Sequence, residues 1–180
     1  MKNFEFEHEG KKYWYSRSIC TVALLFAKDS LGKWYVLANK RGLDEKHKWN
    51  CPAGYLDFDE TIAECAAREV YEETGLKISP DVLHLVFIND NPNESRQNVT
   101  FRYVGLLDEK VEDLSEQLND KHSEKNEVED IKFIPVEDID KYEWAFNHNN
   151  LIKSYSPKIA SNIWTKNEFY SIYLKNNLKK

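Results

Sequence analysis

Residues 54–76 read GYLDFDETIAECAAREVYEETGL, and the rest of the chain is organised around the helix that this stretch predicts. Thr61 is followed three residues later by Glu64, and this capping-box pattern is typical of a helix start. Gly75 stands just past the last helical position, where a glycine adopts the left-handed conformation at low cost. The two signals predict one helix over residues 61–74.

The predicted helix has a core face and an acidic arc beside it. On a helical wheel of about 100° per residue, one stripe collects small and apolar side chains, namely Ile62, Ala63, Ala66, Ala67, Val70 and Thr74. Glu69, Glu72 and Glu73 lie together on an arc of about 100° at the edge of that stripe. The remaining directions of the wheel hold Glu64, Arg68 and Tyr71.

Three carboxylates at this spacing repel one another and need a positive partner. Like charges at helical i,i+4 spacing cost roughly a few tenths of a kcal/mol, and more when they are partly buried. Arg68 is expected to neutralise only one of them. A hard divalent cation such as Mg²⁺ is the natural partner of clustered carboxylate oxygens. The alternative for such a cluster taken alone is a solvated acidic surface. Gly54, in the loop before the helix, favours the metal interpretation because a glycine permits close approach of phosphates.

The segments around the helix alternate between strand and helix patterns. Short apolar, β-branched runs predict strands over residues 19–27, 34–39, 82–88, 99–107 and 131–135. Residues 4–15 predict a hairpin around Gly10, and residues 49–58 an irregular extended stretch. Residues 108–130 predict a loop with at most one helical turn, and further helices are expected over residues 136–142, 147–155 and 166–178. Mixed strands and helices indicate a layered α/β domain with a mixed sheet.

The spacing of the acidic residues resembles that of the Nudix box. Gly54, five residues, Glu60, seven residues and then REVYEETGL at 68–76 reproduce the box without a substitution. Further similarities are the strand that ends in Lys40-Arg41, the Trp49-x-x-Pro52 approach and the Phe133-x-Pro135 strand. The resemblance covers about residues 18–152 and implies a Nudix hydrolase domain with an α/β/α sandwich fold. Residues 1–17 are then N-terminal strands or a hairpin packed on this domain, and residues 153–180 a basic helical extension.

What the resemblance implies is a Mg²⁺- or Mn²⁺-dependent pyrophosphohydrolase. Its substrate would be a nucleoside diphosphate linked to another moiety (a nucleoside diphosphate sugar, ADP-ribose or a modified nucleoside triphosphate), cleaved by attack of water on phosphorus. The alternative is a non-catalytic Nudix-fold module that binds or senses nucleotides. Every box carboxylate is present and no helix-turn-helix is appended, and both facts favour the enzyme.

The resemblance also assigns roles to residues of the box. Glu69 and Glu73 correspond to the principal metal ligands, and Glu72 to a further ligand or a base. The backbone carbonyl of Ala53 is a further ligand, at a position where many relatives carry glycine. Arg68 corresponds to the residue that orients one of the glutamates.

Four residues outside the box are further candidates. Glu127 precedes the last core strand, where relatives carry a metal ligand or base; a solvated acidic loop is the alternative. Arg41 resembles a phosphate-contacting arginine, and a surface ion pair is the alternative. Phe146 could stack on a nucleobase and Asn147 could read its edge, while core packing and helix capping are their alternatives.

Composition and charge limit the classes of partner. The net charge of −6 argues against binding of long nucleic acid. The charge is unevenly distributed, with a net charge of −7 over residues 108–130 and of +5 over residues 151–180. The longest apolar run has nine residues, too short for a membrane helix, and the charged N-terminus is no signal peptide. The three cysteines, Cys20, Cys51 and Cys65, are typical of reduced core thiols in a cytoplasmic protein. The expected partner is a small nucleotide, and a homodimer is left open.

Overall fold

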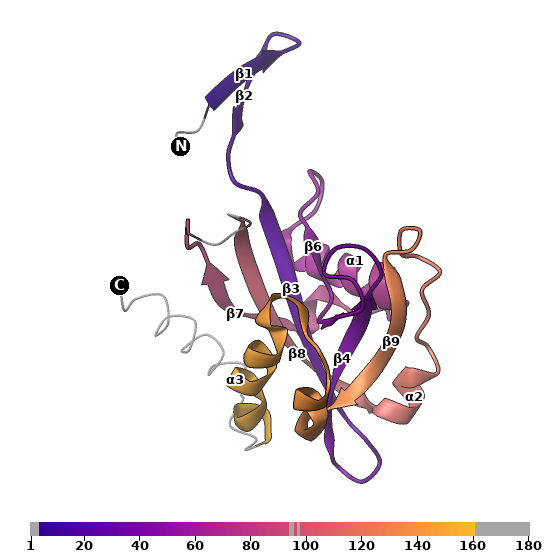
Figure 1. Cartoon of the computed structure of the whole chain (residues 1–180). Helices are drawn as coiled ribbons and strands as arrows, with labels where there is room; N and C mark the ends of the chain where they lie inside the picture. The colour runs from indigo at the N-terminus through magenta and orange to yellow at the C-terminus, as the bar shows by residue number, and fades with distance from the viewer. Residues whose placement is uncertain (1–3, 94–95, 97, 161–180) are drawn as a thin grey trace.

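The computed structural model describes residues 4–93, 96 and 98–160. Within them a seven-stranded sheet forms the centre of the domain (Figure 1). Its strands are β3 (Ile19–Lys28), β4 (Trp34–Arg41), β5 (Trp49–Asn50), β6 (Ala53–Tyr55), β7 (Leu83–Asn89), β8 (Val99–Lys110) and β9 (Val128–Pro135). Strands β3 and β8 are parallel and the other pairs are antiparallel, so the sheet is mixed.

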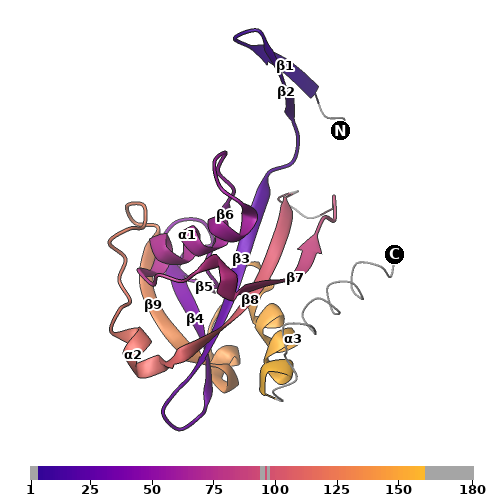
Figure 2. The same ribbon diagram turned by 180° about the vertical axis from the view of Figure 1, so that it is seen from behind.

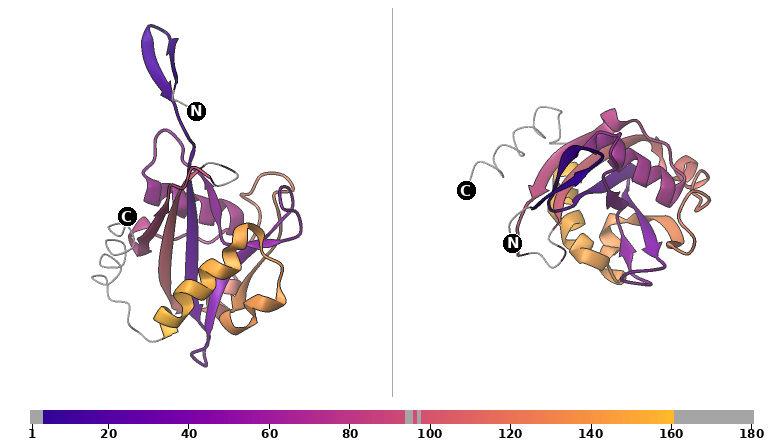
Figure 3. Two further views of the ribbon diagram at one scale, coloured as in Figure 1. Left: turned by 60° about the vertical axis from the view of Figure 1, so that its left-hand side comes forward. Right: turned by 90° about the horizontal axis from the view of Figure 1, so that it is seen from above.

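Helices cover both faces of this sheet. The helix α1 (Ile62–Thr74) packs on one face, while the 3₁₀ helix η2 (Val136–Lys141) and the helix α3 (His148–Ala160) pack on the other (Figures 2 and 3). The expected α/β/α sandwich with a mixed sheet is therefore confirmed. Three short helices complete the described chain, η1 (Pro80–Val82), α2 (Val111–Ser115) and η3 (Ala145–Asn147). No helix in the described ranges combines the length and the apolar character that crossing a membrane requires.

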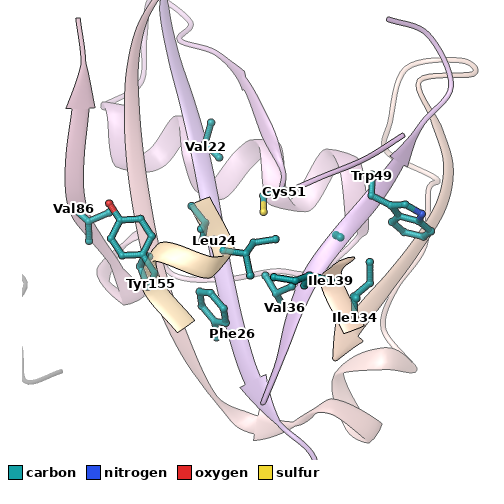
Figure 4. Packing of buried hydrophobic residues seen from close by; sticks show 13 residues of the cluster. Val22, Leu24, Phe26, Val36, Trp49, Cys51, Val86, Ile134, Ile139 and Tyr155 are labelled. Carbon is teal, nitrogen blue, oxygen red and sulfur yellow. The ribbon is translucent and has the colours of Figure 1, made fainter. Parts of the chain in front are cut away.

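The central strand β3 is apolar over residues 22–27 because both of its faces are buried there. Leu24 and Phe26 point into the cluster shared with η2 and α3 (Figure 4). Ala23 and Leu25 point into the opposite cluster, against α1. Full burial of a leucine or phenylalanine side chain contributes roughly 1.5–3 kcal/mol, so these alternating contacts fix β3 between the two helical layers.

The ends of α1 are those that the sequence predicts. The Thr61 hydroxyl accepts the Glu64 N–H at 3.3 Å, and the Glu64 carboxylate accepts the Thr61 N–H at 2.7 Å. Gly75 closes the helix with a φ of 76°. The buried face is rotated from the predicted stripe, since Cys65 and Glu73 are buried. Ile62 is only half-buried.

Several other boundaries differ from the expectations. The extended stretch at residues 49–58 contains the short strands β5 and β6, which pair with β4 and β3. Within residues 108–130, β8 continues to Lys110, α2 forms a short helix and β9 begins at Val128. The segment after Pro135 is a 3₁₀ helix. The helix expected over residues 166–178 lies outside the described residues.

The N-terminal hairpin forms as predicted but does not pack on the domain. Strands β1 (Phe4–His8) and β2 (Lys11–Tyr15) pair around Gly10 and project beyond the end of the sheet (Figure 1). The rings of Phe6 and Tyr13 stack on each other at 5.4 Å and stay exposed. The exposed polar linker at residues 16–18 leads the chain away from the core, so the expected packing is wrong for this structure.

Loops and strand ends gather at the end of the sheet from which the hairpin projects. Strands β3, β8 and β9 begin there, and β4 and β7 end there, as their pairing directions require. The loop between β6 and α1 and the helix η3 reach the same end. Side chains from segments far apart in the sequence therefore meet at this end of the sheet.

Candidate active site

A cleft of about 770 Å³ opens at this end of the sheet. One set of lining side chains is acidic and consists of Asp57, Glu69, Glu72, Glu124 and Glu127. The basic set consists of Arg41, Arg68, Arg96 and Arg102. A volume of roughly 300–1,000 Å³ is typical of small-molecule sites, so the cleft is large enough for a nucleotide.

Glu69 and Glu72 form an acidic wall of the cleft, and Arg68 is hydrogen-bonded to both of them. One of its terminal nitrogens donates to Glu69 Oε1 at 2.9 Å and to Glu72 Oε2 at 2.8 Å. Its Nε and its other terminal nitrogen donate to Glu60 at 3.0 and 2.8 Å. The expectation that Arg68 points elsewhere and neutralises only one glutamate is wrong, because the long guanidinium arm offers five donors. Its hydrogen bonds lower the pKa of Glu60 to about 2.

Glu69 lies against the backbone of strand β6 at Gly54. A Cβ on Gly54 would lie 2.0 Å from Glu69 Oε1, so no side chain fits at that position. Burial raises the pKa of Glu69 to about 7, although Arg68 opposes the shift. The glycine of the box therefore has a steric role here, which is to admit the glutamate carboxyl group.

Glu73 is enclosed rather than placed at the edge of the buried face. Its exposed fraction is 1%, and its Oε2 accepts the Ala53 N–H at 3.2 Å. Burial, followed by the charges of Glu69 and Glu127, raises the pKa of Glu73 well above its usual value. A buried carboxyl group keeps its charge only beside a cation, so this position requires either a proton or a positive partner.

The donor set fits a hard divalent cation. Glu69, Glu72 and Glu73 offer carboxylate oxygens from one helix face, and Ala53 contributes its backbone to the same corner. Within the described residues, however, no three acidic, histidine or cysteine side chains are already gathered in a cation-holding arrangement. Arg68 and the Ala53 N–H hold the carboxyl groups in their present positions, so a cation would compete with these partners.

Glu127 lies in the cleft and Glu129 does not. The backbone oxygen of Glu127 accepts the Gly42 N–H at 2.7 Å, which fixes it beside the end of β4. Its charge acts on the pKa of both Glu69 and Glu73. Glu129 instead pairs with His47 at 2.8 Å, outside the cleft. The structure thus brings the predicted acidic residue to the box glutamates.

The three predicted substrate-binding residues also line the cleft. They are Arg41, Phe146 and Asn147. The Arg41 guanidinium carbon lies 5.0 Å from the centre of the Phe146 ring. Phe146 and Asn147 have φ values of 53° and 57°, a left-handed conformation that is uncommon for residues other than glycine.

The buried residue His148 holds this strained pair in place. Its Nδ1 accepts the Cys51 N–H at 3.0 Å, which links the start of α3 to the loop before β6. Burial lowers the pKa of His148 to about 3, so the ring is neutral and can accept at neutral pH. The bond connects the segment that carries Phe146 to the segment that carries Ala53.

Sequence reasoning missed Arg96 and Arg102 as residues of the cleft, and gave no role to His148. Arg102 carried a signal in the sequence, because it is the charged residue in the first nine residues of β8, VTFRYVGLL at 99–107. Arg96 lies outside any motif, and His148 directly follows the predicted residues Phe146 and Asn147. Only the register of β7 with β8 and the packing of α3 bring these two residues to the cleft.

The chain belongs to the NUDIX family, because the family model described as NUDIX domain matches residues 17–155. Among curated proteins it is similar to phosphatase NudJ of Escherichia coli K12, with 47% identity over 49 residues. This match covers 27% of the chain and only 31% of the relative, so the chain is aligned to about a third of that protein.

Solved structures share the fold at low identity. The NUDIX domain of Shewanella oneidensis NrtR, complexed with ADP ribose, has a TM-score of 0.64 and 20% identity, with 81% of this chain and 90% of that chain covered. A mutT/nudix family protein from Listeria innocua has a TM-score of 0.63 and 21% identity, covering 83% and 98%. The bifunctional NMN adenylyltransferase/ADP ribose pyrophosphatase of Francisella tularensis, complexed with AMP and a Mn ion, has a TM-score of 0.59 and 22% identity, covering 79% and 42%.

Proposed function

We propose that the chain is a metal-dependent pyrophosphohydrolase that cleaves a nucleoside diphosphate linked to another moiety, by attack of water on phosphorus. The observation that carries this proposal is that Glu69 lines the cleft and Glu73 is buried one turn further along the same helix, with the pKa of each raised by burial. A cation would stabilise the charged form of such buried carboxyl groups, whereas carboxylates on a solvated acidic surface are not buried.

The residues that would hold Mg²⁺ or Mn²⁺ are Glu69 and Glu73, with Glu72 and the carbonyl of Ala53 as further ligands. The cation supplies charge neutralisation on the phosphate oxygens and activation of the attacking water. The Francisella tularensis neighbour contains a Mn ion, which supports a divalent cation for this fold. Mg²⁺ is proposed because carboxylate oxygens suit hard cations.

The surrounding side chains orient the reactants. Arg68 positions Glu69 and Glu72 through its paired hydrogen bonds. Glu127 is proposed as a further ligand or as the base that accepts a proton from water. Arg41 is proposed to contact a substrate phosphate, because its charge lies near enough to act on the pKa of Glu73. Asn147 offers an amide that can read the edge of a base.

The proposed partner is a free nucleotide. Neighbours of the same fold are complexed with ADP ribose and with AMP, which supports a nucleotide in this cleft. The net charge of −6 disfavours binding of long nucleic acid. A cytoplasmic location, the lack of membrane association and a homodimer stay predictions.

A nucleotide panel tests the proposal. Nucleoside diphosphate sugars, ADP-ribose, dinucleotides and modified nucleoside triphosphates are each incubated with the protein, Mg²⁺ and ¹⁸O-labelled water, and the products are identified by mass. The expected result is cleavage between two phosphorus atoms, with one label on a product phosphate. Nucleotide binding without any turnover would instead indicate a regulatory module.

Glu127→Gln should reduce kcat by roughly 10²-fold or more, because loss of a base or ligand typically has an effect of this size. Glu129→Gln is the matched control from the same acidic segment, and it should change kcat little because Glu129 pairs with His47 outside the cleft. Steady-state kinetics of both variants give the comparison. Small and equal effects would assign Glu127 to the solvated surface.

A further inference from the structure

Two arginines that line the cleft, from distant segments, share the same two partners, Phe146 and Asp44. Arg41 ends β4, and Arg96 lies between β7 and β8. Their guanidinium carbons lie 5.0 and 4.5 Å from the centre of one ring, that of Phe146. Asp44 contacts both, since its backbone oxygen accepts from Arg41 Nε at 2.6 Å and its carboxylate pairs with Arg96. The two guanidinium groups are therefore held as one unit.

Among the described residues, the partners of this unit neutralise less than its full positive charge. In the described part of the chain, the Asp44 carboxylate pairs with Arg96 while Arg41 donates to the Asp44 backbone oxygen, so one carboxylate faces two guanidinium groups. A guanidinium group keeps its positive charge at neutral pH. Arg41, Arg96 and Phe146 all line the cleft, so the excess charge borders the space where a ligand would lie. Guanidinium groups bind phosphate and carboxylate oxygens through paired hydrogen bonds, and such bonds are stronger than neutral ones.

The acidic wall lies on different elements of the cleft. Glu69 and Glu72 project from α1, and Arg68 is already bonded to both of them. A pyrophosphate held with a cation at that wall leaves the Arg41 and Arg96 pair to meet another part of the substrate. The ring of Phe146 is engaged by guanidinium groups, and this assigns it to positioning the arginines rather than to stacking on a base.

Resting on the proposed function, we infer that Arg41 and Arg96, held by Phe146 and Asp44, form an anion clamp. The clamp selects nucleotides that carry a phosphate or carboxylate group outside the pyrophosphate that is cleaved. A nucleoside triphosphate or a nucleoside diphosphate linked to an acidic sugar fits this description. A nucleoside diphosphate linked to a neutral sugar does not.

Matched substrates test the selectivity. For one nucleoside, kcat and KM are measured with the diphosphate glucose, the diphosphate glucuronate and the triphosphate. The wild type should prefer at least one anionic substrate over the glucose compound by about tenfold or more in kcat/KM, as charge-assisted hydrogen bonds predict. The glucuronate and triphosphate arms then distinguish a carboxylate from a phosphate as the selected group. Equal kcat/KM for all three substrates would overturn the clamp.

Variants locate the selectivity in the clamp. Arg96→Gln should raise KM for the preferred anionic substrate by about tenfold, with little change in kcat and little change for the glucose compound. Phe146→Leu should act in the same direction, and Arg96→Lys should restore part of the loss because it restores the charge. Arg17→Gln is the matched control, since Arg17 lies outside the cleft and donates to the backbone oxygen of Asp90. A loss shared equally by all substrates contradicts the inference.

Binding without turnover separates this inference from the proposed function. Calorimetric titration of nucleoside triphosphate and diphosphate glucose in excess chelator measures the clamp alone. Tighter binding of the triphosphate, lost in Arg96→Gln, supports the clamp even when no nucleotide is hydrolysed, and in that case only the proposed function fails. Hydrolysis without substrate preference and without a binding difference leaves the proposed function intact and rejects the clamp. Thermal melts of each variant verify that it is folded.

Discussion

Glu73→Gln should give a folded protein whose turnover is lower by several orders of magnitude. Glutamine keeps the shape and most of the helix propensity of glutamate, so α1 should form normally. An amide oxygen is a far poorer ligand for Mg²⁺ than a carboxylate, and the enclosed position leaves no space for another group to substitute. Rate measurements at saturating Mg²⁺, together with thermal melts with and without Mg²⁺, give the result. The wild type should be stabilised by Mg²⁺ through mass action and the variant much less.

Glu64→Gln is the matched control on the same helix. Glu64 is exposed, and its carboxylate accepts the Thr61 N–H at 2.7 Å in the capping box. Glutamine serves the same capping role, so stability and turnover should stay near those of the wild type. If Glu73→Gln kept wild-type turnover and a wild-type Mg²⁺ shift, Glu73 would not be a ligand and the site would be misplaced.

Without a bound cation, the difference in stability between Glu73→Gln and the wild type should increase with pH. Burial raises the pKa of Glu73 well above the value of 4.5 expected in the unfolded chain. The folded wild type therefore loses stability as pH rises above 4.5, because only the unfolded state gives up the proton easily. The variant should thus be more stable than the wild type at pH 8, and the difference should shrink toward pH 4.

The local parts of the site could be predicted from the sequence because their signals are local. The capping box at Thr61 and the glycine at Gly75 set both ends of α1 within a few residues of chain. The Nudix box is recognised from the spacing of Gly54 and the glutamates. The structure explains why a glycine is needed at position 54, because Glu69 approaches its backbone closely. Short-range geometry of this kind is encoded by residue spacing alone.

The role of Arg68 could not be predicted from a helical wheel. A wheel gives the direction in which each side chain leaves the helix axis, and Arg68 leaves between the acidic arc and the solvent. Its guanidinium group then reaches one residue along the helix, one turn along it and back to Glu60 in the preceding loop. Side-chain length and the fold of the loop decide these contacts.

The side of the cleft that carries Arg96 and Phe146 depends on tertiary structure. Arg96 and Phe146 are 50 residues apart in the chain, and they meet because β7 ends, β8 begins and η3 lies at the same end of the sheet. The direction of the N-terminal hairpin has the same origin. Pairing around Gly10 is local, whereas docking on the domain would need contacts that a strand pattern does not specify.

Removal of divalent cations should abolish turnover, and Mg²⁺ or Mn²⁺ should restore it. Among the described residues, Arg68 is the cation that contacts the acidic wall, and it is shared among Glu60, Glu69 and Glu72. Substrate phosphates brought to this wall would therefore meet uncompensated negative charge. Activity assays in excess chelator, followed by readdition of each cation, measure the effect; full turnover in chelator would reject the mechanism. Because burial raises the pKa of Glu69 to about 7, cation binding must displace protons. The apparent affinity for Mg²⁺ should therefore fall as pH is lowered below 7, and a titration in weak buffer should release protons.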